Sequence, residues 1–127
     1  MKLLTKLTTV VVVDDIEDCL PEWEALGHQV SVRVPETGRL GFVILAGKAC
    51  ELMLQTRASL KEDLPEIAKR KPGHLLYGET PSLTRAKKAL PKARVIVDER
   101  TTFYGAKETW LELEGGVFLG LAEHKDS

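Results

Sequence analysis

The stretch LTTVVVVDD, residues 7–15, predicts a buried strand, and a related stretch opens the second half of the chain. Val10–Val13 is an unbroken run of β-branched residues, which is typical of a strand covered on both faces. The segments that follow predict one helix and three further strands: IEDCLPEWEALG (16–27), QVSVRV (29–34), LGFVILA (40–46) and CELMLQ (50–55). The first half therefore predicts a βαβββ unit.

The second half repeats this order of segments: HLLYGE (74–79), SLTRAKKALPKA (82–93), RVIVDER (94–100), KETWLELE (107–114) and VFLGLAE (117–123). The offset between the copies is the same from Leu7 to His74, from Ile16 to Leu83 and from Cys50 to Val117. Such a repeat implies two copies of one unit, because neither copy alone can bury both faces of its sheet. The predicted fold class is α+β, with two βαβββ modules in a single domain.

The modules have predicted boundaries. Module one is expected over about residues 5–57 and module two over about residues 74–125. Between them, Ser59 and Glu62 have the spacing of a capping box, which predicts one linker helix over about residues 59–71. The linker helix is expected to end before the pair Pro72-Gly73, because proline and glycine do not continue a helix.

Two local patterns in module one carry specific expectations. The segment QVSVRV alternates apolar and polar residues, so Val30, Val32 and Val34 are expected on one half-buried face of a strand. Pro21 falls inside the predicted helix, although proline is tolerated only in the first turn. The regular part of the helix is therefore expected to begin later than Asp15.

Composition and charge exclude several classes of protein. The 127 residues are 43% hydrophobic, which is enough for one domain with a core. With 18 Lys and Arg against 19 Asp and Glu, the net charge is -1, so a nucleic acid or an anionic membrane is not an expected partner. No apolar run reaches the roughly 18 residues of a membrane-spanning helix, and the N-terminal run lacks a signal-peptide cleavage pattern. Cys19 and Cys50 lack CxxC spacing, so the sequence predicts core cysteines in a cytoplasmic protein.

The order of elements, with the motifs DDIEDCLPEWEALG, ELMLQ, PGHLLY and VFLGLAE, resembles the vicinal oxygen chelate superfamily, the group of glyoxalases, bleomycin-resistance proteins and dioxygenases. The resemblance covers nearly the whole chain. It implies that the modules form a half-barrel cup that holds a small organic ligand. In the enzymes of this family, four strands each supply one ligand to a divalent metal. The family also implies a homodimer.

The four metal positions can be carried over one at a time. The first falls on Thr8, the third on His74 and the fourth on Gly120. The second falls on Glu51 or Met53, depending on the register of CELMLQ, and both residues are expected on the same sheet face. A threonine hydroxyl is a poor ligand for a divalent cation, and glycine has no side chain to donate.

At most two of the four positions therefore carry a metal ligand, His74 and Glu51, whereas even open catalytic sites commonly use three. A register slip that uses Glu123 would shift the strand by an odd number and turn the side chain to the other face. The sequence predicts no metal and no cofactor, with a divalent metal held by His74 and Glu51 as the alternative. His28 and His124 are not expected to be ligands.

The predicted ligand-binding cup combines these positions with aromatic side chains, which suit a planar organic ligand. The residues assigned to it are Thr8, Phe42, Glu51, Met53, His74, Tyr104, Trp110, Phe118 and Gly120. Residues 101–107, TTFYGAK, are the expected mobile rim, where Gly105 allows a bend and Tyr104 can close over a ligand. His74 is either a base or hydrogen-bond donor in the site, or a histidine that only opens a strand.

Three functions stay open at this point, and no catalytic residue is assigned. The leading hypothesis is a metal-independent small-molecule binding protein of the bleomycin-resistance type, for an aromatic or amide-rich compound. The first alternative is a metal-dependent glyoxalase-like lyase, isomerase or dioxygenase that uses His74 and Glu51. The second is an effector-sensing or interaction module without chemistry of its own, since one fold serves many tasks.

Overall fold

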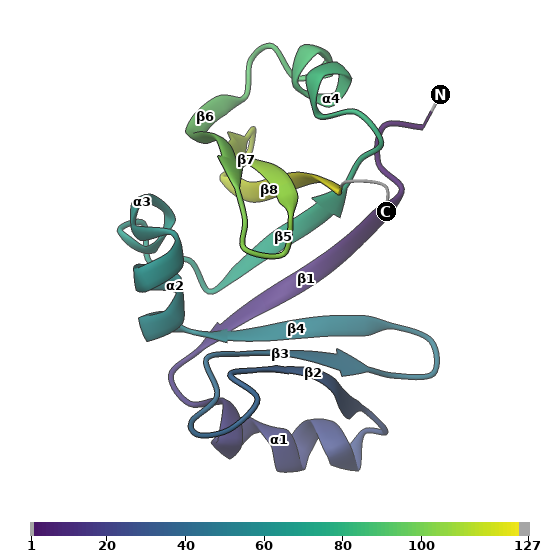
Figure 1. The fold of residues 1–127 in the computed structure, drawn as a ribbon, viewed down its shortest axis with the longest axis vertical. Helices are drawn as coiled ribbons and strands as arrows, with labels where there is room; N and C mark the ends of the chain where they lie inside the picture. The colour runs from purple at the N-terminus through teal and green to yellow at the C-terminus, as the bar shows by residue number, and fades with distance from the viewer. Residues whose placement is uncertain (1, 125–127) are drawn as a thin grey trace. The chain divides into compact units, whose positions relative to one another are not determined.

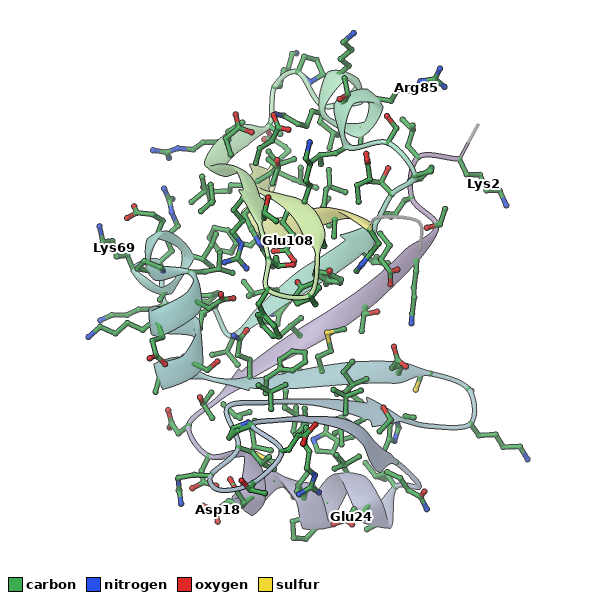
Figure 2. All side chains as sticks on the ribbon, in the orientation of Figure 1. Lys2, Asp18, Glu24, Lys69, Arg85 and Glu108 are labelled. Atoms are coloured by element: carbon green, nitrogen blue, oxygen red, sulfur yellow. The ribbon has the colours of Figure 1, made fainter. Side chains whose placement is uncertain are left out.

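The computed structural model describes residues 2–124, and its elements follow the predicted repeat (Figure 1). The chain divides into two compact units. We call Thr9–His74 the first unit, and the residues up to Thr8 together with those from Leu75 onward the second unit. Figure 2 adds the side chains to the same view. None of the helices in the described part of the chain is long and apolar enough to cross a membrane.

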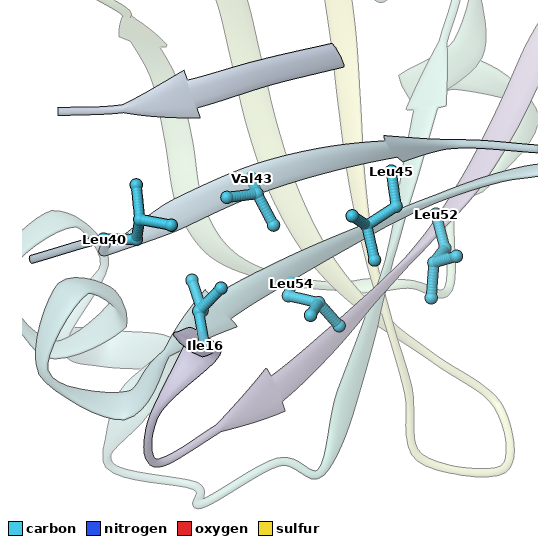
Figure 3. Close-up of a cluster of buried hydrophobic side chains, with 6 residues drawn as sticks. All are labelled: Ile16, Leu40, Val43, Leu45, Leu52 and Leu54. Carbon is cyan, nitrogen blue, oxygen red and sulfur yellow. The ribbon is translucent and has the colours of Figure 1, made fainter. Parts of the chain in front are cut away.

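The first unit contains a four-stranded mixed sheet in the order β2-β3-β4-β1. Its elements are β1 (Lys6–Val13, of which Thr9–Val13 pair with β4), α1 (Ile16–Ala25), β2 (Gln29–Val34), β3 (Phe42–Ala46) and β4 (Glu51–Thr56). Strands β1 and β4 are parallel, whereas β3 is antiparallel to both β2 and β4. Helix α1 covers one face of this sheet, where its buried side chain Ile16 packs with sheet residues (Figure 3). The core on this face consists of Ile16, Leu40, Val43, Leu45, Leu52 and Leu54.

Helix α1 begins directly after Asp15, whose side chain accepts a hydrogen bond from Asp18 N at 3.1 Å. Pro21 lies inside the helix and not in its first turn, which corrects the expectation from the sequence. The helix ends where Gly27 adopts a φ of 97°, a left-handed conformation that glycine reaches without a steric penalty.

The linker contains two short helices, α2 (Arg57–Asp63) and α3 (Pro65–Ala68), where the sequence predicted one helix over residues 59–71. Thr56 caps α2 by accepting a hydrogen bond from Ser59 N at 3.0 Å, so the predicted cap Ser59 lies inside the helix. The break falls at Pro65, which has no N–H to continue a helix and is preorganised for a first helical position.

The second unit contains a sheet in the order β5-β8-β7-β6. Its elements are β5 (His74–Glu79, where His74 is assigned to the first unit), α4 (Leu83–Ala89), β6 (Arg94–Thr101), β7 (Ala106–Leu113) and β8 (Val117–His124). Helix α4 covers one face, where the core consists of Leu83, Ala86, Leu111, Leu119 and Leu121. Glu123 accepts a hydrogen bond from Leu83 N at 2.7 Å, so its side chain lies on this helix-covered face, as the odd register shift predicts.

The prediction that Val30, Val32 and Val34 share one buried face is wrong. Val30 pairs with Leu45 and Val32 pairs with the adjacent Ile44, so a β-bulge lies between the two valines. Because successive side chains in a strand point to opposite faces, the extra residue moves Val32 and Val34 to the face opposite α1. There they are 44% and 38% exposed.

Candidate functional site

The most unusual group in the second unit is the carboxylate of Glu108, which is only 1% exposed. Glu108 is labelled in Figure 2. Its Oε1 accepts hydrogen bonds from Arg100 Nε at 3.2 Å, Arg100 Nη2 at 3.0 Å and Trp110 Nε1 at 3.1 Å. Its Oε2 accepts a hydrogen bond from the hydroxyl of Tyr104. A buried carboxylate is costly unless it is paired and hydrogen-bonded, so these three side chains hold the charge in place. We call Arg100, Tyr104, Glu108 and Trp110 the Glu108 network.

The Glu108 network lies on the sheet face opposite α4. Leu111 and Leu113 pack with the α4 core, and side chains alternate along β7, so Glu108 and Trp110 project from the other face. The register places Ala122 of β8 opposite Glu108 and Gly120 opposite Trp110. The Glu108 network and these two small residues therefore share the sheet face opposite α4.

A β-bulge in β6 brings the arginine to this carboxylate. Val97 pairs with Trp110, but Arg100 and not Glu99 pairs with Glu108, so one extra residue lies between the two pairs. Glu99 has a φ of 35°, which is uncommon for a residue with a side chain and marks the irregular position. Without the bulge, two carboxylates would face each other across the strands.

Tyr104 comes from a tight turn between β6 and β7. Thr102 closes the turn, because its backbone N donates to Ala106 O at 2.8 Å and its hydroxyl accepts from Ala106 N at 3.0 Å. Burial raises the pKa of the Tyr104 hydroxyl, and the hydrogen bond to Glu108 raises it further. The ring is still about half exposed, so Tyr104 presents a flat surface while its hydroxyl is fixed. Next to it, Phe103 is 88% exposed and contacts the Tyr104 ring edge to face.

Tyr77 and His124 extend the Glu108 network along the same face. The Tyr77 hydroxyl lies 3.4 Å from the Tyr104 hydroxyl and 3.4 Å from His124 Nε2. The His124 ring stacks on Tyr104 with 6.1 Å between centroids, and its Nε2 lies 3.8 Å from the carboxylate of Glu79. Burial is the largest cause that raises the pKa of Tyr77. Hydroxyl, imidazole and aromatic groups therefore meet at one place.

Gly120 faces the indole ring of Trp110. A Cβ at this position would lie 2.5 Å from Trp110 Cε2 and Cζ2, a distance that real side chains do not reach. Gly120 is the fourth metal position implied by the family resemblance. The indole therefore occupies the space that a metal-binding side chain at position 120 would need. Gly120 itself supplies no donor atom from a side chain, so this position does not fit a divalent metal.

The other predicted site residues lie in several places. Phe42, Glu51 and Met53 share the face opposite α1, because Val43, Leu52 and Leu54 alternate with them in the α1 core. Thus Glu51 and Met53 project to the same face, as expected. Phe118 lies on the face opposite α4 with Trp110 and Gly120.

Thr8 and His74 lie at the boundary of the units in sequence. Thr8 is buried in the second unit, and His74 is an exposed first residue of β5 that belongs to the first unit. Among residues 2–124 there is no group of three or more His, Cys, Asp or Glu side chains that could hold a metal ion. The absence of a metal cofactor stays a prediction.

Sequence reasoning missed four members of the site: Tyr77, Arg100, Glu108 and His124. A usable signal existed for Glu108, because KETWLELE places it two residues before Trp110 and hence on the same strand face. No such signal existed for Arg100, since its position depends on the bulge.

The first unit also contains a small open depression of about 160 Å³. It is lined by Val12, Arg57, Leu60, Lys61, Ala68, Lys71 and Pro72. None of the predicted site residues lines it, so we do not assign the binding function to this depression.

The comparisons with known proteins show the fold. No family model matches the chain, and no curated protein is similar in sequence. Solved structures do match. A glyoxalase/bleomycin resistance protein/dioxygenase superfamily member from Vibrio splendidus has a TM-score of 0.66 and 15% identity, covering 93% of this chain and 97% of that one. Methylmalonyl-CoA epimerase from Mycobacterium tuberculosis has a TM-score of 0.67 and 20% identity, covering 99% and 92%.

A hypothetical protein from Bacillus halodurans has a TM-score of 0.70 and 21% identity, covering 96% of each chain. At these identities, the comparisons establish the fold and leave the function open. The predicted fold class and the resemblance to the vicinal oxygen chelate superfamily are confirmed at that level.

Proposed function

We propose that this chain, which has the vicinal oxygen chelate fold, is a metal-independent small-molecule binding protein of the bleomycin-resistance type. The observation that carries the proposal is the contact between Trp110 and Gly120, which fills the fourth metal position of the family with an indole ring. Thr8 offers only a hydroxyl at the first position, which is a poor ligand for a divalent cation. Ligand binding then depends on the side chains of the protein itself.

The ligand we propose is a planar aromatic or amide-bearing organic molecule that lies on the second unit's face opposite α4. The half-exposed Tyr104 ring and the exposed Phe103 ring that contacts it supply flat apolar surface. The hydroxyl of Tyr77 and the imidazole of His124 supply a donor and an acceptor within 3.4 Å of each other, as an amide requires.

In this proposal the Glu108 network is a support for the binding face. Glu108 already accepts bonds from three side chains, and its 1% exposure keeps it from direct contact with a ligand. Its role is to fix the orientation of Tyr104 and Arg100 before a ligand arrives. Preorganised side chains lose less conformational entropy on binding, which raises affinity.

Intrinsic fluorescence tests the proposal, because the chain has two tryptophans, Trp23 and Trp110. In a Trp23→Phe variant the signal reports on Trp110 alone. The chelator-treated variant is titrated with a panel of planar aromatic amides and, as controls, aliphatic amides of similar mass. We expect at least one aromatic amide to bind with a Kd of micromolar or tighter, about 8 kcal/mol.

A matched pair of variants separates binding from folding in this experiment. Tyr104→Ala removes the ring and should weaken binding at least tenfold, whereas Leu26→Ala, at an exposed apolar residue next to α1, should not. Binding that appears only after a divalent metal is added would instead support the metal-dependent enzyme with His74 and Glu51. The homodimer that the family resemblance implies is part of the proposal, and native mass spectrometry measures it in the same samples.

A further inference from the structure

His28 and Cys50 of the first unit form a pair that the proposed function does not use. His28 follows the end of α1 and is held there, since its backbone N donates to Trp23 O at 3.0 Å. The Trp23 ring packs edge to face on the imidazole, with 5.6 Å between centroids. His28 is 9% exposed, and its Nε2 lies 3.5 Å from Cys50 Sγ.

The other nitrogen of His28 decides which atom carries the proton. Nδ1 is buried and has no hydrogen-bond partner among the described residues. A proton on Nδ1 would be a buried donor without an acceptor, which is rarer and costlier than a buried acceptor without a donor. The neutral ring therefore carries its proton on Nε2 and directs that N–H at the sulfur.

The turn between β3 and β4 is shaped to this ring. A Cβ on Gly47 would lie 2.6 Å from His28 Nε2 and 2.9 Å from Cys50 O. Gly47 N donates to Cys50 O at 2.8 Å, which closes the turn against the imidazole. Only glycine leaves room for the ring at this position, so His28 and Cys50 are held together by the backbone.

The second cysteine, Cys19, provides an internal contrast. Its thiol is half-buried and donates to Asp15 O at 3.2 Å. Burial raises its pKa, and the nearby carboxylates of Glu22 and Asp18 raise it further. Cys50 is exposed and faces an N–H donor. A donor stabilises a thiolate, whereas burial and negative charge oppose it.

We propose that Cys50 is a reactive thiol, positioned by His28, that forms mixed disulfides with small disulfides such as oxidised glutathione. The thiol first loses its proton to solvent. The Cys50 sulfur then attacks one sulfur of the small disulfide and forms a new S–S bond. The original S–S bond breaks, and the second sulfur leaves with the electron pair as a thiolate. The N–H of His28 stays in place throughout and stabilises the attacking sulfur.

The test uses two single-thiol variants, Cys19→Ser and Cys50→Ser, each incubated with oxidised glutathione and followed by mass spectrometry. Each rate is also measured in urea, where the thiol has no folded surroundings. We expect folded Cys50 to react about tenfold faster than the same thiol in the unfolded chain, because a hydrogen bond to a charged sulfur is lost on unfolding. Folded Cys19 should react more slowly than in urea.

A His28→Phe substitution in the Cys19→Ser background assigns the effect to the imidazole. It should slow the folded protein about tenfold, while circular dichroism confirms that the fold is kept. If this variant does not fold, the proposal is tested by the reaction rate of Cys50 in the folded protein against its rate in urea. A folded rate at or below the unfolded rate would overturn the proposal, because exposure alone then explains the reactivity. An unchanged rate in a folded His28→Phe variant would overturn it as well.

Discussion

The two modules place different chemistry at matching positions of their sheets. In module one, Val34 pairs with Phe42, which pairs in turn with Gln55. The corresponding row in module two is Arg100, Glu108 and Ala122. The apolar Val34–Phe42 pair of module one thus corresponds to the buried Arg100–Glu108 ion pair of module two, while the third residue of the row changes from glutamine to alanine.

The neighbouring row differs in volume and not in charge. Ile44 pairs with Met53 in module one, and Trp110 pairs with Gly120 at the equivalent place in module two. Module one has two side chains of medium size in this row, and module two has one large ring packed over a glycine. The side chains therefore fill a similar volume in both modules. The comparison teaches that the two modules keep the same backbone arrangement, while the side chains on the sheet face opposite the helix differ between them.

The largest expected effect comes from breaking the ion pair. Arg100→Ala leaves the buried Glu108 carboxylate without its cation and should lower the free energy of unfolding by about 3–5 kcal/mol. Urea unfolding measures the change. Arg33→Ala, an exposed arginine on β2, is the matched control and should change stability by less than about 0.5 kcal/mol. Equal effects in both variants would show that Arg100 is an ordinary surface residue.

A double substitution sharpens the same comparison. Arg100→Val with Glu108→Phe gives module two the Val34–Phe42 pair of module one. Because apolar residues can replace a buried ion pair at little cost, this variant should recover most of the stability lost in Arg100→Ala. It should also lose affinity for an aromatic amide, since Tyr104 is no longer anchored. Stability below that of Arg100→Ala would mean that the two rows are not interchangeable.

The next effect in size concerns the contact of Gly120 with Trp110. Gly120→Ala forces a Cβ to within 2.5 Å of the indole and should cost about 1–3 kcal/mol through overpacking. Gly73→Ala is the control, because no described atom lies within 4 Å of its added Cβ. Thermal unfolding compares the two variants. A stable Gly120→Ala protein would show that the indole moves easily and that the fourth position is open.

A smaller effect should appear at alkaline pH. Burial raises the pKa of Tyr77 and Tyr104 above the ordinary value of 10.0. A raised folded pKa means that the folded state retains protons which the unfolded state releases above pH 10, so this contribution to stability is complete below pH 10 and is lost as pH rises further. These are the two tyrosines of the chain, so tyrosinate absorbance should stay absent until the protein unfolds. Tyrosinate formation near pH 10 in the folded protein would contradict the hydrogen-bonded arrangement.

The smallest effect should come from the Tyr104 hydroxyl alone. Tyr104→Phe keeps the ring and removes the bond to Glu108, which should cost about 1 kcal/mol because the residue is half exposed. The variant should also reduce the steepness of the stability loss above pH 10. A chemical denaturation series over pH measures both quantities.

The repeat and the element order could be predicted from the sequence, because they rest on local periodicity and a constant offset. The bulges could not. A single extra residue lies between Val30 and Val32, and another lies between Val97 and Arg100. Each turns the side chains that follow it in the strand to the opposite face of the sheet, and its position depends on pairing with the neighbouring strand. Because the bulge in β6 could not be predicted, Arg100 was absent from the predicted site.

Other misses had visible causes. Pro65 divides the linker into two helices. The prediction of one helix instead followed the spacing of Ser59 and Glu62, which matches a capping box. The sequence alone shows that Gly120 has no side chain to bind a metal. The ring that fills the space next to it belongs to Trp110 on the adjacent strand, and no spacing along the chain predicts that contact.

Calorimetric titration of the chelator-treated Cys50→Ser protein with Zn²⁺, Mn²⁺, Co²⁺ and Ni²⁺ tests the central claim most directly. The substitution removes the contact between Cys50 and His28, whose sulfur and imidazole nitrogen are both ligands for a soft metal. The account predicts no stoichiometric binding tighter than about micromolar, while an aromatic amide still binds. One tightly bound metal per chain that disappears in His74→Ala would contradict it.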